Sequence, residues 1–279
     1  MLPVLLPMVV LTAPLVAAPP VAPPAPSISD PVVLAALFGA GFVAGVLNVI
    51  AGGGSFLTLP ALIFAGLPPT LANGTNRIAI VLQNVTAVGG FQRHRVMDWR
   101  WAALATVPAT AGAALGTWAA LEVGDEAFRK SLAVLMVVVS LWTLIDPFGS
   151  RRGGRGAAEM PTGGRLGVLV VAFFAVGVYG GFVQAGVGFL VLAATTYAGL
   201  DLVRGNAVKV LSILAFTLLS LAIFVAQGMV LWLPGLVVAA GTVLGALLGV
   251  RLTVLKGHRW IQGVVTASIV VFAVLLWFE

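Results

Sequence analysis

The sequence has no cysteine, only two histidines and very little charge. Without cysteine, a disulfide framework or a thiolate metal site cannot form, and His94 and His258 are too few ligands for a haem or an iron–sulfur centre. Only 9% of the 279 residues are charged and 60% are hydrophobic, whereas about a quarter of an ordinary soluble domain is charged. So little charge cannot cover a water-facing surface, so the composition predicts an integral membrane protein with no redox or metal cofactor.

The other exclusions concern nucleic acids and enzymes. The net charge of +6 is typical of a membrane protein whose cytoplasmic loops face anionic lipid, and it does not indicate a nucleic-acid partner. The sequence has no GxxxxGK[ST] motif for ATP and no HExxH or GxSxG motif of a hydrolase. We therefore expect no enzyme activity, no cofactor and no direct use of ATP.

The N-terminal stretch is rich in proline. Residues 1–26 contain eight prolines and no charged residue, which suits neither a signal peptide with a basic start nor a spanning helix. We interpret residues 1–31 as a signal-like or proline-rich extension, with a mis-called start as the alternative. Whether this stretch is cleaved stays open, and we exclude it from the fold.

Apolar segments of about membrane-spanning length follow one another from Val32 onward. They form two sets of four, separated by a linker over 149–165, and predict an all-α polytopic protein with repeats over 32–148 and 166–279. The first segment of each set has about 35 residues and a glycine-rich middle, so we expect two short helices around a break in each. The eight segments are 32–66, 71–92, 101–121, 130–147, 166–199, 202–227, 231–250 and 259–278.

The two sets also match in sequence. A shift of 133 positions places Asn73 on Asn206 and Asn76 on Lys209. The same shift places Trp99 on Trp232 and the GAALG run of 112–116 on the GALLG run of 245–249. One offset that fits several residue types over about fifty residues predicts a tandem structural repeat.

The positive charges predict how the repeats lie in the membrane. Basic residues gather in three loops, which should all be cytoplasmic: 93–100, 151–165 and 251–259. Eight plain crossings in parallel repeats would put the third loop on the opposite side. If each broken segment is a hairpin that enters and leaves on one side, the three loops lie together. The halves are then inverted, with both hairpin tips in mid-membrane.

The two glycine breaks are the first candidates for a binding site. Non-helical backbone at membrane depth is tolerated only where protein or a water-filled cavity satisfies it. Backbone N–H groups at a glycine run before a helix start suit an anion, although glycines also serve close helix packing. The candidates are Gly52, Gly53, Gly54 and Ser55 at the first break, and Gln184, Gly186 and Gly188 at the second.

Polar residues at the starts of the following helices complete the candidate site. Thr75, Asn76 and Arg77 follow the first break, and Asn206 and Lys209 follow the second. A buried cation needs a partner or water, so the substrate is a candidate counter-charge for Arg77 and Lys209. The alternative is that they reach the headgroups. The amides of Asn48 and Gln184 suit oxyanions or hold helices together.

Three further polar positions receive simpler interpretations. The Asp98-Trp99-Arg100-Trp101 stretch is typical of residues that anchor a helix at the cytoplasmic interface. His94 is expected in a loop. Asp146, at the end of the fourth segment, is a candidate proton carrier or a structural helix-end acid.

With these residues in place, the sequence resembles the sulfite exporter TauE/SafE family, also grouped with toluene sulfonate uptake permeases. The resemblance runs from about Val32 to the end of the chain. It implies transport of small sulfur-containing or carboxylate anions across the bacterial inner membrane. The usual family pattern has Thr where this chain has Asn206, so the anion itself is left open. The matching motifs are GFVAG at 41–45, AGGGS at 51–55, PAL at 60–62, Gly66, ANGTN at 72–76, the loop 95–100, and in the second half 177–188 and 204–206.

Together these observations predict a multi-pass secondary transporter that exports sulfite or organosulfonates by alternating access. Its partners are a small anion and the lipid bilayer. The alternatives are an anion channel or a carrier of small carboxylates, and a membrane-embedded enzyme or a scaffold subunit is disfavoured. Proton coupling and the oligomeric state stay open.

Overall fold

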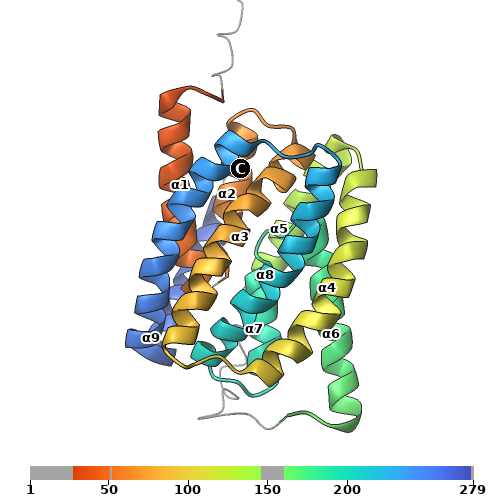
Figure 1. The fold of residues 1–279 in the computed structure, drawn as a ribbon, viewed down its shortest axis with the longest axis vertical. Helices are drawn as coiled ribbons and strands as arrows, with labels where there is room; N and C mark the ends of the chain where they lie inside the picture. The colour runs from red at the N-terminus through yellow and green to blue at the C-terminus, as the bar shows by residue number, and fades with distance from the viewer. Residues whose placement is uncertain (1–27, 51, 146–159, 278–279) are drawn as a thin grey trace, which may run out of the picture.

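The computed structural model describes residues 28–50, 52–145 and 160–277, and every regular element among them is an α-helix. The predicted class, an all-α polytopic protein, is therefore confirmed. Figure 1 shows the helices packed side by side as one bundle. The helices are α1 (Pro31–Ile50), α2 (Ser55–Phe64), α3 (Pro69–Arg93), α4 (Trp99–Glu122), α5 (Asp125–Ile145), α6 (Gly163–Phe182), α7 (Val187–Tyr197), α8 (Leu202–Ala226) and α9 (Trp232–Trp277).

Five of the helices in the described part of the chain are long and apolar enough to cross a membrane: α1, α4, α6, α8 and the first part of α9. The chain is thus a multi-pass membrane protein. α3 has 25 residues, as many as α8, yet is not among the five because it carries several amides and Arg77. Large apolar side chains point outward from the bundle, such as Phe64 and Val107, as expected of a surface in lipid.

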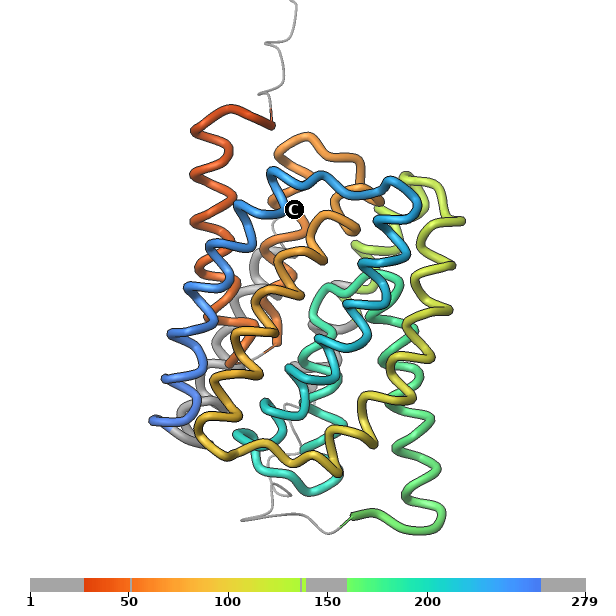
Figure 2. The backbone as a smooth tube through the Cα atoms, in the orientation of Figure 1, coloured from red at the N-terminus to blue at the C-terminus, as the bar shows by residue number. Residues whose placement is uncertain are grey.

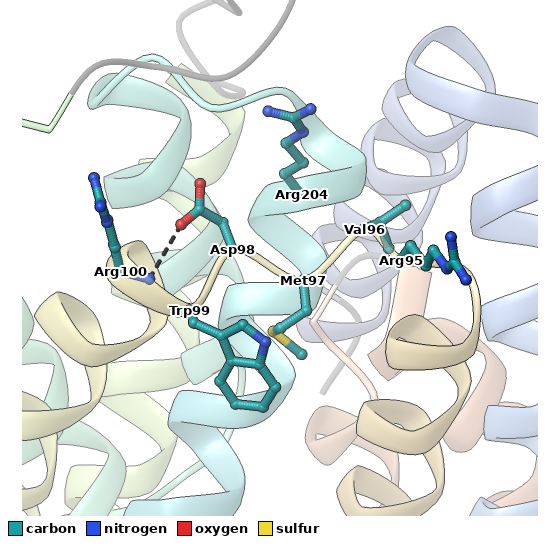
Figure 3. A pocket seen from close by; sticks show the side chains of 7 residues that line it. All are labelled: Arg95, Val96, Met97, Asp98, Trp99, Arg100 and Arg204. Carbon is teal, nitrogen blue, oxygen red and sulfur yellow. Dashed lines mark hydrogen bonds between the residues drawn. The ribbon is translucent and has the colours of Figure 1, made fainter.

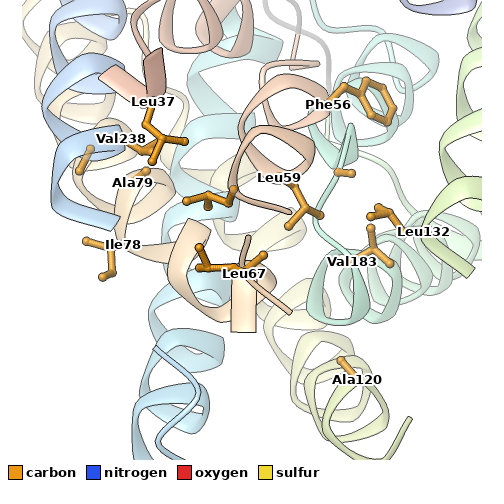
Figure 4. Close-up of a cluster of buried hydrophobic side chains, with 14 of the residues drawn as sticks. Leu37, Phe56, Leu59, Leu67, Ile78, Ala79, Ala120, Leu132, Val183 and Val238 are labelled. Atoms are coloured by element: carbon orange, nitrogen blue, oxygen red, sulfur yellow. The ribbon is translucent and has the colours of Figure 1, made fainter. Parts of the chain in front are cut away.

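The two long segments with glycine in the middle are each two helices, as predicted. α1 descends in Figure 2 and α2 returns upward, whereas α6 ascends and α7 returns downward. Each pair is a hairpin that begins and ends on one side of the bundle. α2 contributes Phe56 and Leu59 to a buried apolar cluster that also contains Val183 of the second break (Figure 4).

The last two predicted segments fall within one helical range. The sequence predicted separate segments over 231–250 and 259–278, and α9 covers both as a range of 46 residues. In Figure 1, α9 descends beside α1 and its last part returns behind the bundle toward the end at which the helix begins. The range is therefore not one straight rod, and its two parts run in opposite directions.

Each half packs its first helix on the fourth helix of the other half. A Cβ on Gly45 of α1 would lie 2.3 Å from the Thr242 O of α9, and one on Gly177 of α6 would lie 2.0 Å from the Ala109 O of α4. These contacts correspond under a shift of 132 positions in the first helix and 133 in the fourth. Small residues here let the helix backbones meet. The repeated contact supports the predicted duplication.

Candidate functional site

Glycine shapes both helix breaks. In the first, between Ile50 and Ser55, Gly52 has φ +98°; in the second, between Phe182 and Val187, Gly186 has φ +68°. Glycine adopts this left-handed backbone without the steric cost of a Cβ. Gln184 has φ +63° as well, although it carries a side chain. The chain therefore reverses sharply at both points, and the second half-helix of each pair begins in the interior.

The two breaks touch one another. A Cβ on Gly52 would lie 2.4 Å from the Gly188 carbonyl carbon, and one on Gly188 would lie 2.4 Å from the Gly52 Cα. Phe56 and Phe189, one on each short helix, stack beside this contact with ring centroids 6.1 Å apart. The structure thus brings together the two predicted parts of the site, and their contact is backbone against backbone.

Lys209 of α8 is buried and holds the C-terminal end of α1. Its Nζ donates to the Asn48 O at 2.8 Å, to the Val49 O at 3.0 Å and to the Asn206 Oδ1 at 2.6 Å. Asn206 in turn donates through Nδ2 to the Ile50 O at 3.1 Å. The three ammonium hydrogens of Lys209 match three acceptors, so this side chain has no donor left for a ligand in this conformation.

Arg77 of α3 holds the end of α6 in the corresponding way. Its guanidinium donates to the carbonyls of Gly180 and Gly181 and to the Gln184 Oε1 at 2.9 Å. It also lies over the Phe224 ring, 4.9 Å from the ring centroid. Unlike Lys209, Arg77 keeps an unused donor, because its Nε is buried and has no hydrogen-bond partner among the described residues.

The ends of α1 and α6 explain why two cations are tolerated inside the bundle. The last carbonyls of a helix have no partner within it and carry the negative end of the helix dipole. A cation that lies at this end of the helix interacts with the negative end of the dipole. This interaction offsets part of the free energy that desolvation of the buried cation costs. The sequence did not show which groups balance the charges of Arg77 and Lys209. In the structure each cation lies at a helix end that belongs to the opposite half.

The asparagines beside the two cations repeat the same arrangement. Asn73 donates through Nδ2 to the Phe182 O at 2.8 Å, as Asn206 does to the Ile50 O. Phe182 and Ile50 are the last residues of α6 and α1. Each half therefore contributes one cation and one amide that close the broken helix of the other half.

Several buried polar atoms of α2 and α3 have no hydrogen-bond partner among the described residues. Besides the Arg77 Nε, these are on α3 the Asn73 Oδ1, the Asn76 Oδ1 and both amide atoms of Gln83, and on α2 the Thr58 Oγ1. Burying an unpaired polar group is costly, so such groups are expected where a ligand or water completes the structure. α3 thus carries most of the unused hydrogen-bonding capacity.

Not every predicted residue joins this group. The Thr75 hydroxyl accepts from the Leu231 N at 3.0 Å and so lies against the loop between α8 and α9. Asn48 takes part through its carbonyl, not through its amide. Gly53 accepts from the Phe56 N at 3.0 Å and Gly54 packs on α1, so both are occupied in the turn. Ser55 is buried at the start of α2.

Sequence reasoning missed Thr217 and Phe224 of α8. Thr217 accepts from the Gln184 Nε2 at 2.6 Å, and Phe224 covers the Arg77 guanidinium. Thr217, Ser220 and Phe224 are three and four residues apart and so lie on one helix face. The two hydroxyl residues on this face of an apolar helix are the sequence signal that could have indicated it. Asp98 caps α4 by accepting from the Arg100 and Trp101 N–H groups, and His94 follows the end of α3. Asp146 and Ala51 lie outside the described residues.

Comparisons with known proteins identify relatives of this chain. A family model described as "Sulfite exporter TauE/SafE" matches residues 37–276. A "Probable membrane transporter protein" of Haemophilus influenzae is 34% identical over 83% of this chain and 89% of that protein. The "Probable membrane transporter protein YfcA" of Escherichia coli K12 is 31% identical over 89% and 91%. A "Probable membrane transporter protein ORF9" of Sinorhizobium sp is 28% identical over 87% and 92%. No solved structure matches.

Proposed function

This chain belongs to the sulfite exporter TauE/SafE family and is a membrane transporter, and we propose that it exports small sulfur-containing anions such as sulfite or organosulfonates. Export would proceed by alternating access through a bacterial inner membrane. The contact between the two breaks, flanked by Arg77 and Lys209, is the observation that carries the proposal.

The proposed anion position lies beside Arg77. The unpaired Arg77 Nε–H offers a donor on α3, and an oxyanion accepts such a bond more strongly than a neutral group does. Gln184, Gly186 and Gly188 would shape the second-break side of the site, and Ser55 and Asn76 the first-break side. Lys209 and Asn206 would act through charge and through their hold on α1. A sulfite or sulfonate, with three oxygens on one centre, suits several donors at once.

Movement of the hairpins would open the site to each side in turn. Each cation sits in one half of the chain and binds the helix end of the other half. A hairpin can therefore rock only if these bonds move with it or break. An anion that takes donors from Arg77 would weaken its hold on α6, which couples occupancy to the movement.

The proposal is tested by ligand binding followed by flux. We expect sulfite or a simple sulfonate to raise the melting temperature of the purified protein in a thermal-shift screen that includes sulfate, thiosulfate and small carboxylates. In proteoliposomes the same anion should show saturable flux, measured with and without a proton gradient. If only carboxylates bind, the proposed substrate class changes from sulfur-containing anions to carboxylates. Flux that does not saturate would indicate a channel.

A further inference from the structure

A cavity lies away from the breaks, where the end of α3 meets the starts of α4 and α8. Its volume is about 310 Å³, and three arginines line it together with Asp98 and Trp99: Arg95, Arg100 and Arg204 (Figure 3). The end of α3 and the starts of α4 and α8 lie at the end of the bundle where α6 also begins (Figure 1). We propose that this cavity binds a phosphate group, either of an anionic lipid or of a free phosphate-type anion.

The charge around the cavity is unbalanced. The Asp98 Oδ1 accepts from the backbone N–H groups of Arg100 and Trp101. The Asp201 Oδ1 likewise caps α8, and its Oδ2 lies 3.7 Å from the Arg204 Nε. Both carboxylates are thus held at helix starts. Within the described part of the chain no ion pair is found for Arg95 or Arg100, so two arginines that line the cavity have no carboxylate partner.

Arg95 has a backbone conformation that glycine favours and arginine does not. α3 ends with the Val96 N donating to the Phe91 O, and Arg95 has φ +56°. In the repeat, a shift of 133 residues leads to Gly228, which has φ +68° and the same pattern, with the Met229 N donating to the Phe224 O. Glycine suits this left-handed position and arginine is strained there. The same turn therefore works with glycine, and the arginine serves something other than the fold.

The repeat also shows that the positive charge is not a by-product of duplication. The corresponding loop, 227–231, contains no charged residue. Guanidinium groups bind phosphate oxygens through paired hydrogen bonds, and basic pockets between helices on the cytoplasmic side of a membrane suit lipid headgroups. Trp99, which is 56% exposed beside the cavity, is the kind of side chain found at headgroup level.

The binding test uses the purified full-length protein in a neutral detergent. Thermal shift and native mass spectrometry are measured with phosphatidylglycerol, with zwitterionic phosphatidylcholine and with inorganic phosphate. The test variant is Arg95→Gly combined with Arg100→Gln, because glycine fits the turn at residue 95. The matched control is Arg93→Gln, an exposed arginine at the end of the same helix that does not line the cavity.

We expect phosphatidylglycerol to bind at least about tenfold more weakly to the double variant than to the parent and the Arg93→Gln control, consistent with loss of charge-assisted hydrogen bonds. Binding of phosphatidylglycerol with no effect of inorganic phosphate assigns the site to a lipid headgroup. Equal competition by inorganic phosphate assigns it to a free anion. Equal binding by the double variant and the parent, or preference for phosphatidylcholine, overturns the proposal. Sulfite transport is not part of this readout, so the result stands apart from the proposed function.

Discussion

At the scale of single residues, the two buried cations show how an internal repeat can keep an interaction while its residues change. Lys209 corresponds in sequence to Asn76, whereas Arg77 is one position further on. Both nevertheless bind the last carbonyls of the opposite first helix. The interaction is kept at the helix end, whose carbonyls need a donor in any sequence. The difference lies in the unused donor, which only Arg77 has.

Arg77→Gln should weaken anion binding in addition to weakening the hold on the end of α6. Glutamine removes the charge and the free Nε–H, so we expect the dissociation constant for the transported anion to rise by about tenfold or more. Binding to the purified variant is measured by thermal shift at increasing anion concentration. The dissociation constant of Arg77→Lys, which keeps the charge, should lie between those of the parent and of Arg77→Gln. An unchanged dissociation constant in Arg77→Gln would remove Arg77 from the binding site.

Lys209→Met should act mainly on stability. The substitution leaves the carbonyls of Asn48 and Val49 buried without their donor, which costs about 3 kcal/mol on the scale of a broken buried pair. We expect a clearly lower melting temperature without ligand. Lys256→Met, at an exposed lysine, is the control and should melt as the parent does. A parental melting temperature in Lys209→Met would mean that the helix end finds another partner.

At the scale of helices, substitution of a glycine at a break has two costs that can be measured separately: the loss of the close contact between the breaks and the strain of a left-handed backbone. Gly52 and Gly66 have φ +98° and +99°, but only at Gly52 would a Cβ meet other atoms. Gly66→Ala should therefore cost only the left-handed strain, about 1–2 kcal/mol, and Gly52→Ala should cost at least about 2 kcal/mol more through overpacking. Denaturation of both variants in one detergent gives the difference. Equal losses would show that the breaks separate easily.

The sequence predicted the helices well because the signals are local. Apolar length, proline, glycine and charge are properties of short windows, so both hairpins were predicted from single segments. The hydrogen bonds of Arg77 and Lys209 were not predicted, because their acceptors are backbone carbonyls more than 100 positions away. A carbonyl carries no residue-type signal, and its helix must first be placed in space. The continuous helical range over 251–258 was not predicted, since charge marks where a chain meets water, not where a helix ends.

At the scale of the whole molecule, the direction of the helices supports inverted halves. α3 runs downward in Figure 1 and α8 upward, and α4 runs upward while α9 starts downward. The ends of the bundle also differ in charge, since α4, α6 and α8 begin at the bottom, with Arg100, Arg165 and Arg204 in their first turns. The loop between α4 and α5, with Asp125 and Glu126, lies at the top. The positive-inside rule therefore predicts that the bottom is cytoplasmic.

Cysteine labelling tests this orientation directly, because the chain has no cysteine of its own. Gly124→Cys places a thiol in the loop between α4 and α5, where a side chain meets no neighbouring atom, and Lys256→Cys places one in the basic stretch of α9. In intact cells an impermeant maleimide should label position 124 and not position 256, and permeabilised cells should label both. The second condition controls for a thiol that cannot react. Eight plain crossings in parallel repeats would place 256 on the side opposite to 95, whereas inverted hairpins place the two together. An additional Arg95→Cys variant that is labelled from the opposite side to Lys256→Cys would therefore contradict the inverted arrangement, whatever the absolute orientation of the protein.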